Sequence, residues 1–435
     1  MDFDGAQLGS EPVRLQTGRS DLQQFEEAAF HRWYSFVLGF SDQLVGNILD
    51  QFAVSADQTV FDPFCGTGTT MIECAKRTIR SVGMDANPFA AFASRVKSRF
   101  DLHPETLMRA AARVEERYRD IVTSNRRLTD GPIHSYLLES GMLERGWISK
   151  RPLRKALALR EAIQRGQDAS LVDVFMLALV ADLSTNIGNM KFGPQIYRGA
   201  AKVDADPMPL FKARVNAMVK DLRGAVGRES YAQPIVIHGD ARSLKPTLRK
   251  HFNSAIPRID FVICSPPYPT EHDYTRHTRL ELAFMENVST LDCLRKIKRS
   301  MIRSHTKGIY KGDTDEHRVV GITSIENLAK EVERAVKDKE SGFEKLYPTV
   351  VRSYFGGMKR HFGSLFRLMR SGGRAAYVVG DQAAYLRIPI RTAVLLGEVA
   401  ESVGFEIDEI KLWRRRWSTG ISNYLDENIL FLRKP

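Results

Sequence analysis

Short apolar runs that suit β-strands alternate with helical stretches near the start of the chain. Residues 58–62 (QTVFD) and 80–85 (RSVGMD) are the first two predicted strands. Each is followed by a stretch with helical character, which begins at Thr69 after the first strand and at Pro88 after the second. This alternation predicts βαβ units and a parallel sheet.

The alternation then stops, and helical spacing alone continues over a long stretch. From Leu107 to Ile121, apolar side chains recur every three or four positions, as they do on one face of a helix. Further helices are expected over residues 171–183 and 210–222. The pattern predicts an insertion made of helices only, residues 101–234, between the second and third strands of an α/β sheet.

Strand and helix patterns return after the insertion. Strands are expected within residues 233–240 (QPIVIHGD), 258–264 (RIDFVIC), 374–381 (RAAYVVGD), 406–413 (EIDEIKLW) and 428–434 (NILFLRK). Helices are expected over residues 346–370, capped by the glycines of residues 371–373, and over residues 390–405. We expect residues 25–100 and 235–435 to form the core, with a loose tail at 1–24 and an irregular, charge-rich region at 270–345.

Composition and charge narrow the class of protein only a little. Lysine and arginine total 64 against 52 acidic residues, a net charge of +12, which weakly favours a polyanionic partner such as nucleic acid. The four cysteines form no CxxC pair, so we expect neither a metal site nor a disulfide framework. The most apolar stretch, residues 171–183, contains two aspartates and is too short to span a bilayer. We therefore expect a cytoplasmic protein that does not enter a membrane.

A glycine-bearing turn follows the first predicted strand, in the stretch VFDPFCGTGTTMIECA (residues 60–75). Gly66 and Gly68 would let the backbone approach a ligand closely. The turn lacks the GK[ST] of a phosphate-binding loop and the G-x-G-x-x-G of a dinucleotide-binding fold. An NTPase and an NAD enzyme are therefore both disfavoured.

Two further acidic residues follow strands on the same predicted edge. Asp85 ends the second strand, and Asp240 follows the third. Open α/β sheets bind ligands outside the carboxyl ends of their strands, where an acidic side chain can accept hydrogen bonds from ribose hydroxyls. The glycine turn and the two acids together predict a nucleotide-like ligand at this edge.

A second motif, Ser265-Pro266-Pro267-Tyr268, follows the apolar strand that ends at Cys264. The combination of DPFCGTGTT (residues 62–70) with SPPY resembles the amino-group DNA methyltransferases that use S-adenosylmethionine. The resemblance covers about residues 55–100 and 235–435. It implies a Rossmann-like, seven-stranded, mostly parallel sheet that ends in an antiparallel hairpin.

The resemblance also implies the roles of particular residues. In the family the glycine loop wraps the methionine part of the cofactor, the acid after the second strand binds ribose, and the acid after the third strand, here Asp240, binds the adenine. The cofactor-binding residues implied here are Asp62, Pro63, Phe64, Gly66, Gly68, Thr69, Asp85, Asp240 and Ala241. The aromatic segment from Trp33 to Leu44 is loosely similar to a further cofactor-binding motif of the family.

The SPPY motif suits methylation of an exocyclic amine. Such an amine is a poor nucleophile because its lone pair is delocalised into the ring. Rigid acceptors at the Pro266 carbonyl and the Ser265 hydroxyl can hold the amine so that its lone pair faces the methyl group, and Pro267 adds stiffness. Tyr268 can stack on the base, which must be flipped out of the duplex to reach it.

The first residue of the motif, Ser265, indicates which base is the target. Serine there is more typical of cytosine-N4 enzymes in the family, and aspartate of adenine-N6 enzymes. We therefore favour cytosine N4, with adenine N6 as the alternative and an RNA guanine-N2 enzyme as a weaker one. Methylation at cytosine C5 needs a nucleophilic cysteine after a proline, and no Pro-Cys pair occurs in the chain. We interpret Cys264 as a core residue.

Several basic residues are candidates for contacts with duplex DNA, the expected partner. They are Arg276, Arg279, Arg414, Arg415 and Arg416. Residues 293–312 contain seven lysines and arginines and no acid, which makes the 270–345 region a candidate for target recognition. Asp273 is a candidate acceptor for the released proton, and His272 is the histidine nearest the motif. A bacterial or phage modification setting is expected, with a cognate restriction or defence system as a further candidate partner.

Overall fold

The computed structural model describes residues 28–35, 39–124, 128–129, 131–166, 169–192, 196–225, 231–253, 255–337, 342–418 and 421–435. The predicted tail, residues 1–24, lies outside these ranges, as does part of the segment from Trp33 to Leu44. No helix in the described part of the chain is long and apolar enough to cross a bilayer.

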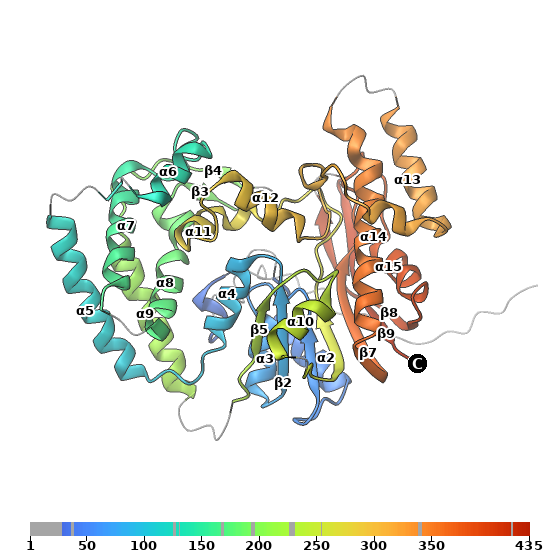
Figure 1. The fold of residues 1–435 in the computed structure, drawn as a ribbon, viewed down its shortest axis with the longest axis horizontal. Helices are drawn as coiled ribbons and strands as arrows, with labels where there is room; N and C mark the ends of the chain where they lie inside the picture. The colour runs from blue at the N-terminus through green and yellow to red at the C-terminus, as the bar shows by residue number, and fades with distance from the viewer. Residues whose placement is uncertain are drawn as a thin grey trace, which may run out of the picture.

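A seven-stranded sheet forms the centre of the molecule (Figure 1). Its strands are β1 (Thr59–Asp62), β2 (Arg80–Asp85), β5 (Ile235–His238), β6 (Ile259–Cys264), β7 (Met369–Gly380), β8 (Glu406–Ser418) and β9 (Asn423–Arg433). They lie in the order β5-β2-β1-β6-β7-β9-β8, and only β9 runs antiparallel to its neighbours. The predicted Rossmann-like sheet with a terminal antiparallel hairpin is confirmed.

Helices cover both faces of this sheet, which is why its central strands are apolar along their whole length. The four residues of β1 are all buried, and β6 is buried at all but one position. On one face lie α2 (Asp42–Gln51), α3 (Thr69–Lys76) and α4 (Pro88–Lys97). On the other lie α10 (Leu244–Phe252), α14 (Tyr347–Phe366) and α15 (Thr392–Glu401).

A separate group of helices lies beside the sheet, between β2 and β5 in the sequence (Figure 1). It contains α5 (Pro104–Thr123), α6 (Pro132–Glu139), α7 (Lys150–Gln164), α8 (Ala169–Val180) and α9 (Pro207–Ala225). Its apolar core is continuous with side chains of α4. The expectation of helices only is wrong in one detail, because β3 (Met190–Lys191) and β4 (Tyr197–Arg198) form a two-stranded antiparallel sheet.

Two further expectations are corrected by the backbone. Residues 270–345 are not simply irregular, since they contain α11 (Arg279–Phe284), α12 (Leu291–Arg299) and α13 (Thr323–Val336). The glycines of residues 371–373 do not cap α14, which ends at Phe366. They belong to β7 instead, where the backbones of Gly372 and Gly373 exchange hydrogen bonds with Lys434 at 2.8 and 2.9 Å.

Candidate active site

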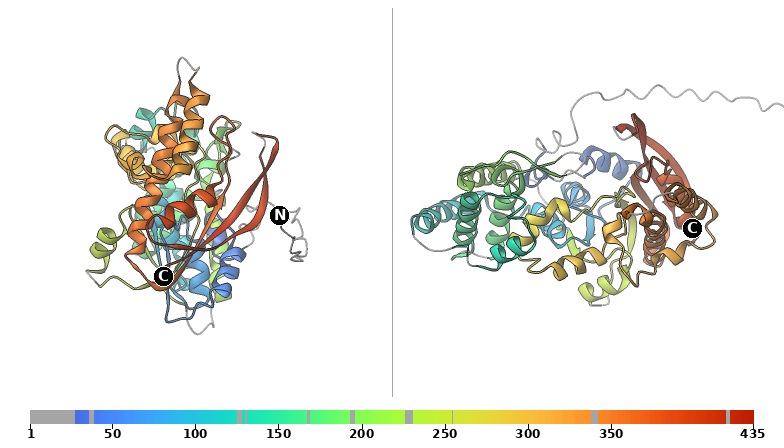
Figure 2. Two further views of the ribbon diagram at one scale, coloured as in Figure 1. Left: turned by 90° about the vertical axis from the view of Figure 1, so that its right-hand side faces the viewer. Right: turned by 90° about the horizontal axis from the view of Figure 1, so that it is seen from above.

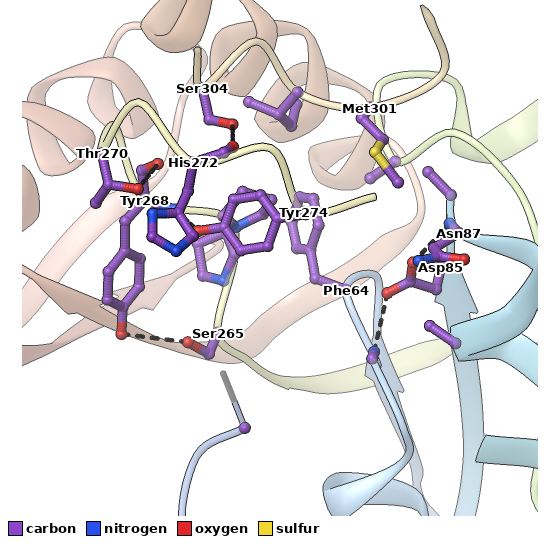
Figure 3. A pocket seen from close by; sticks show the side chains of 18 of the residues that line it. Phe64, Asp85, Asn87, Ser265, Tyr268, Thr270, His272, Tyr274, Met301 and Ser304 are labelled. Atoms are coloured by element: carbon purple, nitrogen blue, oxygen red, sulfur yellow. Dashed lines mark hydrogen bonds between the residues drawn. The ribbon is translucent and has the colours of Figure 1, made fainter. Parts of the chain in front are cut away.

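A cavity of about 540 Å³ lies at the carboxyl ends of the central strands (Figure 3). Its wall combines the glycine loop after β1, the end of β2, the SPPY segment after β6, residues 298–308 and the hairpin of β8 and β9. Figure 3 shows Asp85 and Phe64 on one side and Ser265, Tyr268 and His272 on the other. The two sequence motifs therefore share one cavity.

The glycine loop is folded around a buried carboxyl group. Asp62 is fully buried and accepts hydrogen bonds from the Phe64 N–H at 3.0 Å and the Thr70 hydroxyl at 2.7 Å. Burial raises the pKa of Asp62 to about 7, against the lowering effect of these two hydrogen bonds. Asp62 does not line the cavity, in contrast to the predicted direct contact with the cofactor. Its place in the structure is to hold the loop.

The two glycines of the loop serve different purposes. Gly66 lines the cavity with φ at 50°, and its N–H donates to Asp85 at 2.9 Å. Gly68 has φ at 94° and does not line the cavity, because it packs against α4. A Cβ on Gly68 would lie 2.5 Å from the Ser94 hydroxyl oxygen. The predicted residues Pro63, Phe64 and Thr69 do line the cavity.

Asp85 ends β2 and lies in the cavity wall. One carboxyl oxygen accepts from the Gly66 N–H, and the other accepts from the Asn87 N–H at 2.7 Å. Burial raises the pKa of Asp85 from its ordinary value, although both backbone hydrogen bonds lower it. The carboxyl group thus joins the glycine loop to the end of the second strand.

Of the two cofactor-binding residues predicted after the third strand, Ala241 lies at the cavity and Asp240, the predicted adenine contact, does not. The Arg242 backbone N–H and guanidinium both donate to the Asp240 carboxylate, with a shortest distance of 2.7 Å from Nη2. The guanidinium also donates to Asp315 at 2.7 Å. Asp240 is therefore committed to a buried ion-pair network beside the cavity.

The SPPY segment is fixed on both sides, and the Pro266 carbonyl is left unused in the described part of the chain. The Pro267 carbonyl accepts from the Tyr354 hydroxyl at 2.8 Å, and the Tyr268 N–H donates to the Tyr274 hydroxyl at 2.8 Å. The Ser265 and Tyr268 hydroxyls lie 3.4 Å apart at the cavity wall (Figure 3). Within the described residues, the Pro266 carbonyl has no hydrogen-bond partner. All four residues line the cavity.

Asp273 is a poor candidate for taking up a proton. Its carboxylate accepts from Lys298 at 2.5 Å and from Arg279 at 3.2 Å. Burial alone would raise the pKa of Asp273, but the two cations lower it well below its usual range. His272, by contrast, lines the cavity, and burial lowers its pKa, so its ring is neutral near pH 7.

The five arginines predicted to contact DNA lie in different surroundings. Arg414 and Arg416 line the cavity, and both pair with the buried carboxylate of Glu427. Arg415 is exposed and pairs with Asp426 at 3.2 Å. Neither Arg276, which is exposed, nor Arg279, which Asp273 holds, lines the cavity.

Residues 298–308 form a part of the wall that was not predicted from the sequence. Lys298, Ser300, Met301, Ile302, Arg303, Ser304, His305 and Gly308 line the cavity, although their sequence indicated only a basic surface. Trp413 and Glu427 of the hairpin were also missed as lining residues. Nothing in the local pattern shows that these segments pass over the strand ends, because that depends on the path of the chain between them.

One cluster near α2 has a spacing that could suit a metal ion. Ligand atoms of His31, Asp42 and Glu73 lie within 4.8 Å of one another. The Glu73 carboxylate, however, accepts a hydrogen bond from the Lys76 ammonium group at 2.7 Å and lies 2.9 Å from the His31 ring. The Lys76 ammonium group thus already supplies a cation to this carboxylate. We interpret the cluster as a structural hydrogen-bond network.

Comparisons with known proteins agree with this geometry. Residues 41–128 match the family model of the RMKL-like methyltransferase domain. The chain is 22% identical over 437 residues to the type II methyltransferase M.BsoBI of Geobacillus stearothermophilus, covering 91% of this chain and 82% of the relative. It is 21% identical over 428 residues to the type II methyltransferase M.AvaI of Nostoc sp., covering 93% and 83% of the two chains. The resemblance to S-adenosylmethionine-dependent DNA methyltransferases is confirmed.

Proposed function

We propose that the protein is a site-specific DNA methyltransferase that methylates the exocyclic N4 of a flipped cytosine, with S-adenosylmethionine as methyl donor. The observation that carries this proposal is the single cavity whose opposite sides are the glycine loop and the SPPY segment. A methyl donor on one side and an amine on the other would meet within it. The relatives' description as type II methyltransferases supports DNA as the substrate.

The donor side of the cavity fits a positively charged nucleoside. When bound, S-adenosylmethionine supplies an electrophilic methyl group on a sulfonium. Asp85 is positioned to accept hydrogen bonds from ribose hydroxyls, and Gly66 leaves the backbone open beside it, since no atom lies within 4 Å of its Cβ position. Phe64 and Ala241 give this side apolar surface for the adenine and the methionine chain.

The SPPY side supplies the two acceptors that an exocyclic amine requires. The Pro266 carbonyl is unused, whereas the neighbouring Pro267 carbonyl is committed to Tyr354. The Ser265 hydroxyl can accept the second N–H, because it can donate its own proton to Tyr268. These acceptors are rigid, so they hold the amine in place without reorganisation during the transfer.

The proposed transfer balances without a strong base. The N4 lone pair of the base forms the new carbon–nitrogen bond as the carbon–sulfur bond of the donor breaks, and one N–H proton then leaves. His272 is neutral in the cavity wall and can accept that proton. Asp273 is excluded from this role by its two cationic partners.

The choice of cytosine N4 rests on Ser265 and the family tendency described above. Adenine N6 presents the same pair of N–H groups to the same acceptors, so it is the second candidate. An RNA guanine-N2 activity is the weaker candidate, because the relatives are described as type II methyltransferases.

The experiment that tests the proposal reads modified bases directly. The wild-type protein and the variant Tyr268→Ala are expressed in a host without cognate methylation, and host DNA is sequenced by a method that distinguishes modified bases. We expect N4-methylcytosine in one short sequence context with the wild-type protein only. N6-methyladenine would show that the target base is adenine and not cytosine. Methyl transfer to tRNA or rRNA with none to DNA would overturn the proposal.

A further inference from the structure

The terminal hairpin is longer than the sheet to which it belongs. Pairing between β7 and β9 ends at Gly380 and Glu427, whereas pairing between β8 and β9 continues to Ser418 and Asn423. Residues 415–418 and 423–426 form an extension, here called the arm, which beyond the hydrogen bond from the Asp381 N–H to the Asp426 carbonyl is two-stranded. Figure 2 (left) shows the end of this hairpin standing clear of the helices.

The arm exposes two large aromatic side chains near its end. Trp417 and Tyr424 are directly paired across the strands, and they are 53% and 56% exposed. Their ring centroids lie 5.1 Å apart in an edge-to-face arrangement. Such a pair helps to hold a hairpin together, but it also leaves aromatic surface in water. The pair stabilises this two-stranded extension, and its exposed ring surface remains available to a ligand.

The base of the arm lies at the cavity. Trp413, Arg414, Arg416 and Glu427 line the cavity, so the arm begins where the proposed target base enters. A bulge at Trp413, between the pairs of Leu412 and Arg414, adds to the twist of the hairpin at this point. The arm therefore lies where it can contact the nucleic acid on either side of that base.

We propose that the arm binds the DNA duplex beside the flipped nucleotide, with Trp417 and Tyr424 contacting bases and the arginines contacting phosphates. This inference rests on the proposed function. A two-stranded ribbon fits the major groove, aromatic rings can stack on bases that flipping leaves unpaired, and arginines neutralise phosphates. The three consecutive arginines, residues 414–416, share two acidic partners in the described part of the chain, Glu427 and Asp426, so this edge of the hairpin keeps an excess of positive charge that suits a polyanion.

The same charges argue against a second copy of this chain as the partner that binds the arm. β8 is the last strand of the sheet, and an exposed edge can pair with another edge. Pairing β8 with β8 of another copy over the arm would bring the three consecutive arginines of each strand close to those of the other. Like charges directly opposite one another destabilise a strand pair.

The test replaces both rings without removing the hairpin. The double variant Trp417→Leu/Tyr424→Leu is compared with Leu412→Ala, which removes an exposed apolar side chain (44% exposed) from the same strand where it pairs with the sheet. We expect the double variant to bind a duplex containing the target sequence at least about tenfold more weakly. S-adenosylmethionine affinity should be unchanged in both variants, and DNA affinity should be unchanged in Leu412→Ala.

Further measurements distinguish an error in the proposed role of the arm from an error in the proposed function. Trp417→Phe should keep most of the DNA affinity that Trp417→Leu loses, because a ring can still stack. Unchanged DNA affinity in the double variant would overturn the inference and leave the proposed function intact, provided that the wild-type protein methylates DNA. If light scattering shows that the wild-type protein forms dimers that the double variant does not, the occupant is a second copy and the inference is wrong. A wild-type protein that modifies only RNA would overturn both.

Discussion

The carboxyl groups at and behind the two sides of the cavity are held in opposite ways. On the glycine-loop side, Asp62 and Asp85 accept hydrogen bonds from backbone N–H groups, and Asp62 also from a hydroxyl. Neither has a lysine or arginine partner among the described residues. On the SPPY side, Lys298 and Arg279 hold Asp273, and two arginines hold Glu427.

The pKa values follow from this difference. Burial raises the pKa of Asp62 to about 7 and raises that of Asp85 as well. The pKa of Asp273 is lowered far below its usual range, although that carboxylate is also largely buried. Desolvation disfavours the charged form in all three, and only Asp273 has nearby cations that outweigh it.

This difference fits the two ligands that we propose. A buried carboxyl without a counter-ion favours a ligand that brings its own positive charge, such as a sulfonium with an ammonium group. A surface with its acids already neutralised, and with further arginines, favours a polyanion. The cavity thus carries opposite electrostatic preferences on its two sides, and each can be tested separately.

The largest effect is expected from Asp85→Ala. This change removes the proposed ribose contacts and frees the Gly66 N–H that Asp85 now holds. Because a hydrogen bond to a charged group contributes about 1.5–3 kcal/mol, losing two of them should weaken S-adenosylmethionine binding by roughly 100-fold or more. Isothermal titration calorimetry measures this, with Asp57→Ala on the exposed loop before β1 as the control. Unchanged affinity would place the cofactor elsewhere.

Tyr268→Ala tests the other side of the cavity. We expect kcat/KM for duplex DNA to fall by about 10- to 100-fold, because the stacking of a base on an aromatic ring contributes about 1–3 kcal/mol. S-adenosylmethionine affinity should be nearly unchanged. Tyr268→Phe separates the two roles of this residue, since it keeps the ring and removes only the hydroxyl that can accept the Ser265 proton. Loss of cofactor binding in Tyr268→Ala would show that the two sides are not independent.

The raised pKa of Asp62 predicts a pH dependence of cofactor binding. With a pKa of about 7, the Asp62 carboxyl is largely protonated at pH 6, and a cationic ligand favours its charged form. Binding should therefore release protons, and affinity should rise between pH 6 and 8, by up to about tenfold per pH unit for each proton released. Calorimetry in two buffers of different ionisation enthalpy counts the protons. Asp62→Asn should flatten the profile, and a wild-type affinity that falls with rising pH would contradict the assignment.

The features that the sequence predicts well are those that depend on neighbouring residues. The apolar runs of β1, β2 and β6, and the turn between β1 and α3, arise from local patterns and appear at the expected positions. The end of α14 was misplaced because two glycines were interpreted as a cap. Their backbones pair instead with Lys434, which is distant in the sequence.

The site was predicted less completely than the fold, for a related reason. Asp240 lies at the expected strand end, but Arg242 and Asp315 draw its carboxylate into an ion-pair network that no single stretch of sequence reveals. The basic run after Cys293 was interpreted as one surface. In the structure, Lys298 and Arg303 are partly or fully buried with acidic partners at the cavity, while Arg299 and Lys311 are exposed.

The smallest effect is expected from two arginines, both predicted from the sequence to contact DNA, which the structure places in different surroundings. Arg276 is exposed, and Arg276→Ala should reduce DNA affinity only about two- to threefold, with the slope of log K against log salt lowered by about one if it contacts a phosphate. Arg249→Ala, an exposed arginine on α10, is the matched control and should leave the slope unchanged. Arg279→Ala should instead lower the melting temperature, because it removes one of the two cations that hold Asp273. An unaltered salt slope in Arg276→Ala would restrict the DNA-binding surface to the hairpin side of the cavity.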